Sequence, residues 1–155
     1  MCSDPNFDVL PAARKVSAAH ITGLVVIDTN IVLDMFVFND PASNGIKTSL
    51  ATGTRQWIAS SVMRDELERV LAYPHIVLKL DFYKISAESV LALFDQHARL
   101  APVAAKAPAV CKDPDDQKFI DLAVAHQALL LSKDNAVLTM KKRLLGLGVG
   151  VGNAM

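Results

Sequence analysis

The feature that most constrains the fold is a set of short, continuously apolar runs separated by segments of helical length. The runs are residues 24–27 (Leu-Val-Val-Ile), 57–59 (Trp-Ile-Ala) and 128–132 (Ala-Leu-Leu-Leu-Ser). A strand that is covered on both faces, as in a parallel sheet, has this unbroken apolar character. Because the runs alternate with segments that have helical signals, we predict an α/β domain with a mainly parallel sheet.

The segments between the runs carry the start and stop signals of helices. Proline suits the first position of a helix and glycine suits the residue after its end, so Pro41 and Gly53 bound a predicted helix over residues 41–52. Ser60 or Ser61 caps the next helix, and Pro74 closes it. Further helices are predicted to begin at Ser86, at Asp113 and just before residues 141–143. Residues 102–103 form a predicted edge strand.

The length and composition predict one folded domain. The chain has 155 residues, of which 52% are hydrophobic and 21% are charged, so a packed core is expected. We predict an N-terminal arm over residues 1–20 with a short helix around residues 12–19. The folded domain then covers residues 21–145. Residues 146–155 are rich in glycine, and we predict a flexible tail without a clear strand.

Charge and cysteine content exclude several classes of protein. The net charge is zero, with 16 basic and 16 acidic residues, so binding to nucleic acid through a broad basic surface is not expected. A local groove for RNA is compatible with this balance. Two cysteines are too few for a disulfide framework. The chain lacks the pattern of a signal peptide and an apolar stretch of the ~18 residues that a membrane helix needs. A cytoplasmic protein without membrane association is therefore expected.

Acidic residues fall where predicted strands end and helices begin. Asp28 directly follows the first apolar run, and Asp134 lies just beyond the third. Glu66 and Asp116 lie near the starts of two predicted helices. In an open parallel sheet, ligands bind beyond the carboxyl ends of the strands. We therefore expect these acids to meet at that edge of the sheet.

Such a group of acids favours a bound cation. Carboxylates that lie close together raise one another's pKa values, and a cation relieves their repulsion. Mg²⁺ and Mn²⁺ prefer carboxylate oxygen atoms and water as ligands. A metal held in this way can activate water and stabilise the charge that builds up on a phosphodiester during its hydrolysis. The chain has no histidine pair with the spacing of metal ligands.

Each acid also has a structural interpretation. Asp28 and Asp134 could be acids of turns or loops, and Glu66 could lie on a solvated helix face. Acids at a helix start cap free N–H groups, and each contributes ~0.3–1 kcal/mol. Three acids at the start of one helix exceed what capping needs. We assign the cap to Asp113 and a metal ligand to Asp116, and Asp115 stays unassigned.

Four sequence motifs, in this order, resemble those of PIN-domain ribonucleases, especially the toxin components of toxin–antitoxin pairs. The motifs are residues 25–30 (Val-Val-Ile-Asp-Thr-Asn), 61–67 (Ser-Val-Met-Arg-Asp-Glu-Leu), 113–119 (Asp-Pro-Asp-Asp-Gln-Lys-Phe) and 130–134 (Leu-Leu-Ser-Lys-Asp). The resemblance extends over residues 24–143. Each motif is weakly specific alone, whereas four in the family's order and spacing are fairly specific. The long N-terminal arm and the absence of a clear last strand depart from the family pattern.

The resemblance implies a three-layer α/β/α fold and metal-dependent cleavage of single-stranded RNA. It also implies frequent homodimers and, for many members, an antitoxin partner. The acidic quartet of the family corresponds to Asp28, Glu66, Asp116 and Asp134. Asn30 and Ser132 correspond to polar residues that orient the metal ligands, and we add Asp113 to this supporting group.

Three lysines lie close in sequence to the proposed site acids. Lys112, Lys118 and Lys133 each lie near a proposed site acid, where they could contact RNA phosphates or merely offset negative charge.

A structure-specific DNA nuclease could use the same acids. A binding module that retains the acids without catalysis is the other alternative. An aspartyl phosphatase would need an aspartate at position 30, where this chain has Asn30.

Overall fold

The computed structural model describes residues 23–155 of the chain. Five strands form one sheet in the order β3-β2-β1-β4-β5, and every pairing is parallel. The strands are β1 (Leu24–Ile27), β2 (Gln56–Ala59), β3 (Ala98–Leu100), β4 (Leu129–Leu131) and β5 (Val151–Gly152). The three apolar runs predicted as strands correspond to β1, β2 and β4, and the prediction of a parallel sheet is confirmed.

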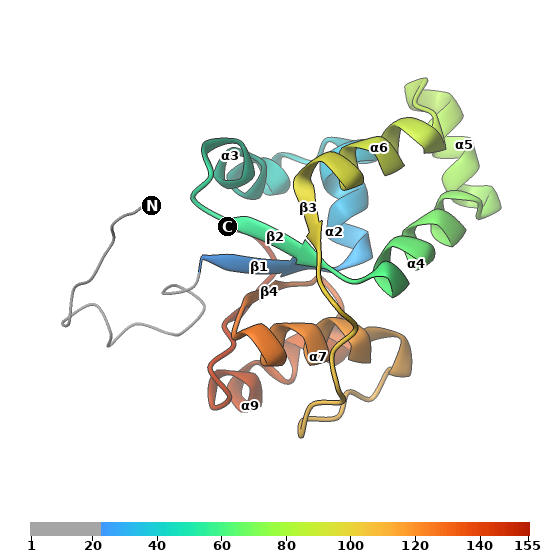
Figure 1. Cartoon of the computed structure of the whole chain (residues 1–155). Helices are drawn as coiled ribbons and strands as arrows, with labels where there is room; N and C mark the ends of the chain where they lie inside the picture. The colour runs from blue at the N-terminus through green and yellow to red at the C-terminus, as the bar shows by residue number, and fades with distance from the viewer. Residues whose placement is uncertain (1–22) are drawn as a thin grey trace.

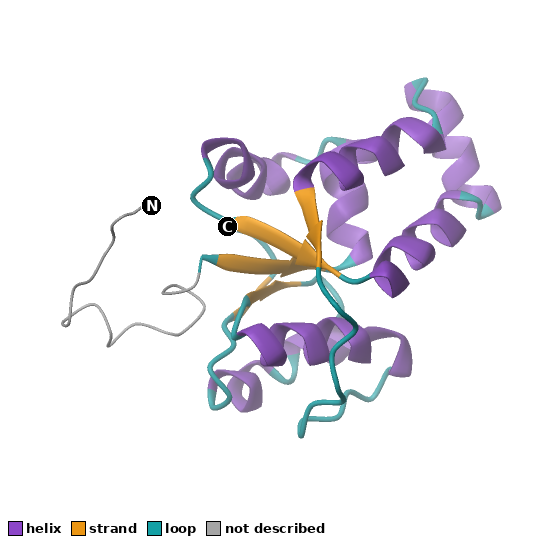
Figure 2. Cartoon of the chain, viewed as in Figure 1, coloured by secondary structure: helices purple, strands orange, loops and turns teal. Residues whose placement is uncertain are grey.

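Helices cover both faces of this sheet, which confirms the predicted three-layer α/β/α architecture. In Figure 1, α2 to α6 lie on one side of the sheet, and α7 and α9 lie on the other. Figure 2 shows the same layers by element type. The helices are α2 (Thr29–Leu33), α3 (Asn44–Thr52), α4 (Ser61–Leu71), α5 (Pro74–Tyr83), α6 (Ala87–His97), α7 (Gln117–His126), α8 (Asn135–Leu138) and α9 (Lys141–Leu145). A π-helical segment η2 (Asp34–Phe38) and two 3-10 turns, η3 (Pro41–Ser43) and η4 (Pro114–Asp116), join them.

Local sequence signals account for most helix boundaries. Gly53 ends α3 with a φ of 79°, a left-handed conformation that glycine adopts without strain. The Ser86 side chain accepts a hydrogen bond from the backbone N–H of Ser89 and caps α6. Pro74 lies beyond the end of α4, but it also starts a helix, α5, that the sequence analysis did not predict. Proline at a first helical position is compatible with both roles.

The predicted edge strand at residues 102–103 is wrong. The edge strand on the β2 side of the sheet is β3, which follows α6 directly and pairs with β2, with Trp57 opposite Ala98 and Ala59 opposite Leu100. Residues 98–100 form a strand because they pair with β2. A contact between such distant parts of the chain leaves little trace in the local sequence.

The C-terminal segment is not a tail without a strand, as was predicted. Val151 and Gly152 form β5 beside β4, and the backbone N–H of Ser132 donates to the Gly152 carbonyl at 2.9 Å. Val149 is fully buried and Val151 is 5% exposed. Met155 lies against Gly45 of α3, and a side chain at position 45 would collide with the Met155 backbone. The predicted N-terminal arm lies outside the described residues.

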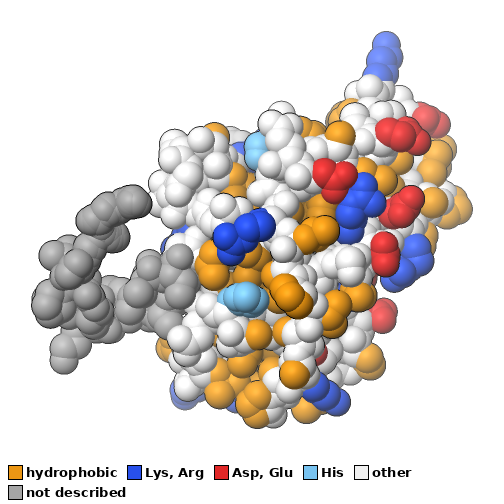
Figure 3. Space-filling view, in the orientation of Figure 1, with side chains coloured by type: hydrophobic (Ala, Val, Ile, Leu, Met, Phe, Trp, Pro, Cys, Tyr) orange, Lys and Arg blue, Asp and Glu red, His pale blue; other side chains and the backbone are white. Residues whose placement is uncertain are grey.

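Apolar packing on both sides of β1 and β2 forms the core. Val25, Val26 and Ile58 are fully buried in the sheet. Trp57 of β2 meets the Phe94 ring of α6 edge-on, with 5.0 Å between ring centroids. Acidic and basic side chains are interspersed on the face that Figure 3 shows, in keeping with the zero net charge. Within residues 23–155, no helix is long and apolar enough to cross a membrane.

Candidate metal centre

Asp28 is held at the carboxyl edge of the sheet, between β1 and α2. Its backbone N–H donates to the Leu131 carbonyl at 2.9 Å and so continues the pairing of β1 with β4. The chain then turns into α2, where the Ile31 and Val32 N–H groups donate to the Asp28 carbonyl. This turn buries the Asp28 side chain, which is 4% exposed.

Ser132 connects Asp28 to Asp134. Its hydroxyl donates to Asp28 Oδ2 at 2.6 Å and accepts a hydrogen bond from the backbone N–H of Asp134 at 3.1 Å. Ser132 is fully buried at the end of β4. Asp134 caps α8, where its Oδ1 accepts from the Ala136 N–H at 2.8 Å. One serine thus fixes the positions of two acids, Asp28 and Asp134, that follow the neighbouring strands β1 and β4.

Asp113, Asp116 and Asp134 form the tightest group of acids in the described part of the chain. One carboxylate oxygen from each lies within 4.8 Å of the other two. Asp113 caps the turn η4, since its Oδ1 accepts from the Asp115 N–H at 3.0 Å. Asp116 ends that turn and is 7% exposed. We call Asp113, Asp116 and Asp134 the aspartate cluster.

One oxygen atom of this cluster has no hydrogen-bond partner. Asp116 Oδ2 is the single buried side-chain oxygen or nitrogen of residues 23–155 without one. Leaving a buried charged group unpaired carries a penalty of several kcal/mol, so such atoms are rare in folded proteins. A proton or a cation at this oxygen would remove the penalty.

The pKa values of the buried acids reflect this environment. Burial raises the pKa of Asp116 to about 8, helped by a hydrogen bond to Asp134 that favours the protonated form and by the charges of Asp28, Asp134 and Asp113. Burial also raises the pKa of Asp28. The Ser132 hydroxyl and the backbone N–H of Asn30 oppose that rise, whereas the charges of Glu66 and Asp134 add to it. Both shifts show that the apo site resists full ionisation.

Glu66 lies near Asp28 but outside the aspartate cluster. Its Oε1 accepts a hydrogen bond from Thr29 Oγ1 at 2.9 Å and lies 3.3 Å from Lys118 Nζ. The Glu66 charge nevertheless contributes to the raised pKa of Asp28, so the two carboxylates share one electrostatic environment. The structure thus places Asp28 between the aspartate cluster and Glu66.

The remaining predicted residues differ in their surroundings. Asn30 is exposed, and the group that it directs at Asp28 is its backbone N–H. Lys133 forms an ion pair with Asp34 at 2.7 Å, Lys118 also donates to the Asp115 carbonyl, and Lys112 is exposed.

Two residues of this region were missed by the sequence analysis. Thr29 holds Glu66, and its position beside Asp28 in the Asp-Thr-Asn motif was the available signal. Asp34 is 7% exposed and holds Lys133. An isolated acid in an apolar stretch was the only hint of its role.

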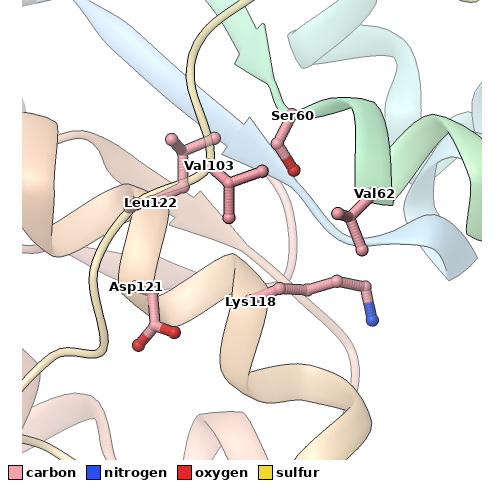
Figure 4. Close-up of a pocket in the computed structure, with 7 residues that line it drawn as sticks. Ser60, Val62, Val103, Lys118, Asp121 and Leu122 are labelled. Atoms are coloured by element: carbon pink, nitrogen blue, oxygen red, sulfur yellow. The ribbon is translucent and has the colours of Figure 1, made fainter.

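A pocket lies beside the acids and shares Lys118 with them. It has about 280 Å³ of empty space, including its open mouth. Figure 4 shows side chains from the start of α4, from the segment after β3 and from α7 around it. The lining residues are Ser60, Val62, Val103, Ala104, Lys118, Asp121 and Leu122.

The aspartate cluster fits a hard divalent cation. Three carboxylates, one of them with a buried oxygen that lacks a partner, offer the oxygen ligands that Mg²⁺ and Mn²⁺ prefer. Ser132 orients Asp28 at the border of the cluster, as residues behind a metal site often do.

Fold and site together define an α/β protein that gathers carboxylates at the carboxyl edge of a parallel sheet. The chain belongs to the PIN domain family, since the family model described as PIN domain matches residues 24–136. This membership confirms the resemblance that the four sequence motifs indicated. PIN domains generally depend on divalent metal ions, and the carboxylate cluster accords with that dependence.

The fold also occurs in a solved complex. A chain in the crystal structure of VapBC2 from Rickettsia felis, bound to a DNA fragment from their promoter, is similar with a TM-score of 0.56 and 16% identity. The match covers 83% of this chain and 98% of that chain. At this identity the similarity shows the fold alone. A comparison with curated proteins found no significant match.

Proposed function

We propose that this protein is a hydrolase that cleaves phosphodiester bonds of single-stranded RNA with the help of Mg²⁺ or Mn²⁺. The observation that carries the proposal is the buried Asp116 oxygen without a partner, inside the aspartate cluster. A cation would satisfy this oxygen and neutralise the surrounding charges. PIN family membership supports nuclease activity as the use of such a site.

Asp113, Asp116 and Asp134 would hold the metal, with Asp28 as the next carboxylate in reach. When bound, the cation supplies Lewis-acid activation of water and stabilises charge on the phosphate. Asp116 must lose its proton before it can act as a ligand. Ser132 keeps Asp28 and Asp134 in fixed orientation through its two hydrogen bonds. In this proposal Asp113 takes a ligand role in addition to its cap.

Lys118 would contact the RNA substrate, and Glu66 would act on a water molecule beside it. Lys118 Nζ lies 3.3 Å from Glu66 Oε1, so Glu66 holds the Lys118 ammonium group beside the acids. An RNA phosphate that approaches the metal would find this ammonium group as a donor. Glu66, freed in part from Lys118, could then accept a proton from a water molecule or contact the metal through one.

We further propose an antitoxin partner and a homodimer. The support for the partner is the similarity of fold to a chain of the VapBC2 complex, together with PIN family membership. Co-expression with the product of an adjacent gene and light scattering of the purified protein would test both. Localisation in the cytoplasm stays a prediction from sequence.

The test is cleavage of labelled single-stranded RNA with Mn²⁺ or Mg²⁺ and then with a chelator. Asp116→Asn is run beside the wild type, and matched single-stranded and duplex DNA are run in parallel. We expect RNA cleavage that needs the metal and is lost in the variant. Preferential cleavage of DNA would support the alternative of a DNA nuclease. Metal binding without cleavage of any substrate would favour a non-catalytic binding module.

A further inference from the structure

The pocket next to the Lys118–Glu66 ion pair offers a site for part of the substrate, and this inference rests on the proposed nuclease function. Lys118 belongs to both places, because it lines the pocket and lies 3.3 Å from Glu66 Oε1. In Figure 4 the Lys118 side chain extends from α7, and its amino group lies on the side of Val62 and α4. A phosphate held near Lys118 would therefore have the pocket as its neighbour.

The wall of the pocket is anchored by hydrogen bonds from α7. Asp121 Oδ1 accepts from the Ala107 N–H at 2.8 Å and from Gln117 Nε2 at 2.8 Å. The Gln117 side chain also bonds to the Ala109 carbonyl at 3.0 Å and accepts from the Cys111 N–H at 2.7 Å. These bonds hold residues 107–111, in the segment that follows β3, against α7. The pocket is thus preformed, which lowers the entropic penalty of ligand binding.

The chemistry of the lining suits a nucleobase. Val62, Val103 and Leu122 give apolar walls, and Val62 and Val103 are 43% and 63% exposed at the mouth. Ser60 and Asp121 add polar groups in the same pocket. A base has flat apolar faces and a polar edge, and proteins recognise single-stranded RNA by covering those faces and bonding to that edge.

The pocket and the aspartate cluster meet near the start of α7. Asp116 directly precedes this helix, and its residues Lys118 and Leu122 line the pocket. A phosphate at the aspartate cluster would place its adjoining nucleoside near these first turns of α7. We propose that the pocket receives the base of a nucleotide that flanks the scissile phosphate and so selects where RNA is cut.

Filling the pocket tests this proposal. Val103→Trp places a large ring at the mouth, and Val110→Trp is the matched control, because Val110 is 54% exposed on the same segment but outside the pocket. Both variants are checked for wild-type folding by circular dichroism and thermal melting. Cleavage sites are mapped on an RNA library. We expect the wild type and Val110→Trp to share a base preference next to the cut, and Val103→Trp to lose it with a roughly tenfold lower kcat/KM.

A substrate with an abasic nucleotide at the preferred position separates pocket from metal site. On this RNA the wild type should be about as slow as Val103→Trp, because the base that fills the pocket is missing. Binding is measured in parallel by fluorescence anisotropy, with each tryptophan variant combined with Asp116→Asn so that no cleavage occurs. If no protein cleaves RNA but Val103→Trp still weakens binding of the intact oligonucleotide tenfold, the base site stands and the nuclease function fails.

Equal cleavage patterns and equal binding for Val103→Trp and Val110→Trp would overturn the inference. A Val103→Trp protein that binds RNA normally but loses a protein inhibitor would also overturn it, in favour of a protein side chain as the occupant.

Discussion

At the scale of single residues, the site depends on how each acid is satisfied. Asp28 has the Ser132 hydroxyl at 2.6 Å, and Glu66 has Thr29 and Lys118. Asp116 Oδ2 has no partner, although Asp116 is 7% exposed. The place of a cation follows from this contrast, because a carboxylate oxygen that already has a donor gains less from a metal than one that has none.

Removing the charge of Asp113 should weaken metal binding without loss of the helix cap. In Asp113→Asn the side-chain oxygen can still accept from the Asp115 N–H, but one carboxylate of the aspartate cluster is gone. We expect Mn²⁺ affinity, measured by isothermal titration calorimetry, to fall about tenfold or more. Asp115→Asn is the control on the same turn and should leave the affinity unchanged. Equal affinities in both variants would show that Asp113 is only a cap.

The raised pKa of Asp116 predicts how stability changes with pH in the metal-free protein. The pKa is about 8 in the folded state against 3.8 ordinarily, so between these values the folded state binds more protons than the unfolded state. Stability from this group is complete below about pH 4 and is lost as the pH rises toward 8. Denaturant unfolding of the wild type and Asp116→Asn, each with a chelator, should show a smaller decline in the variant. A parallel decline in both proteins would contradict the assignment.

Ser132→Ala should destabilise the protein by about 1–3 kcal/mol, because it leaves the buried Asp28 carboxylate without its hydroxyl donor. The same change removes the acceptor for the Asp134 N–H. Urea unfolding at neutral pH gives the measurement. Ser89→Ala removes an exposed serine hydroxyl that also makes a hydrogen bond, and it should change stability by less than about 0.5 kcal/mol. Similar losses in the two variants would mean that Ser132 has no special role in the site.

At the scale of elements, the parallel sheet brings the acids together. Asp28 follows β1, and Asp134 lies just beyond β4, which pairs with β1. Glu66 comes from α4, which follows β2, and Asp116 comes from η4 before α7. Since β2 and β4 flank β1, their following segments converge on the same edge. The edge strand β5 completes this order on the side of β4.

Truncating a buried side chain of β5 tests whether the C-terminal segment is part of the fold. Val151 is 5% exposed, so Val151→Ala should lower the free energy of unfolding by about 1–3 kcal/mol. Val110→Ala is the control at a valine that is 54% exposed, and its effect should stay within about 0.5 kcal/mol. Urea unfolding measures both. Equal small effects would restore the prediction of a loose tail.

At the scale of the whole molecule, a cation that binds only the folded state must stabilise it. The aspartate cluster joins Asp113 and Asp116 of one turn to Asp134 beyond β4, so the site does not exist in the unfolded chain. Saturation at a hundred times the dissociation constant adds about 2.7 kcal/mol. We expect Mn²⁺ to raise the melting temperature of the wild type and a chelator to reverse the rise. Asp116→Asn should show a much smaller shift. A full shift in that variant would place the metal elsewhere.

The sequence by itself indicated strands β1, β2 and β4, many helix boundaries and the acids that follow strands, whereas β3 and β5 were not predicted. Apolar runs such as Leu24–Ile27 and caps such as Ser86 and Gly53 act within a few residues, so they can be read locally. Tertiary structure alone decided that Val151 pairs with β4, that Glu66 turns to Lys118 and Thr29, and that Asp134 joins Asp113 and Asp116. These outcomes depend on contacts between residues far apart in the chain, because burial and pairing are properties of the assembled sheet and not of any one segment.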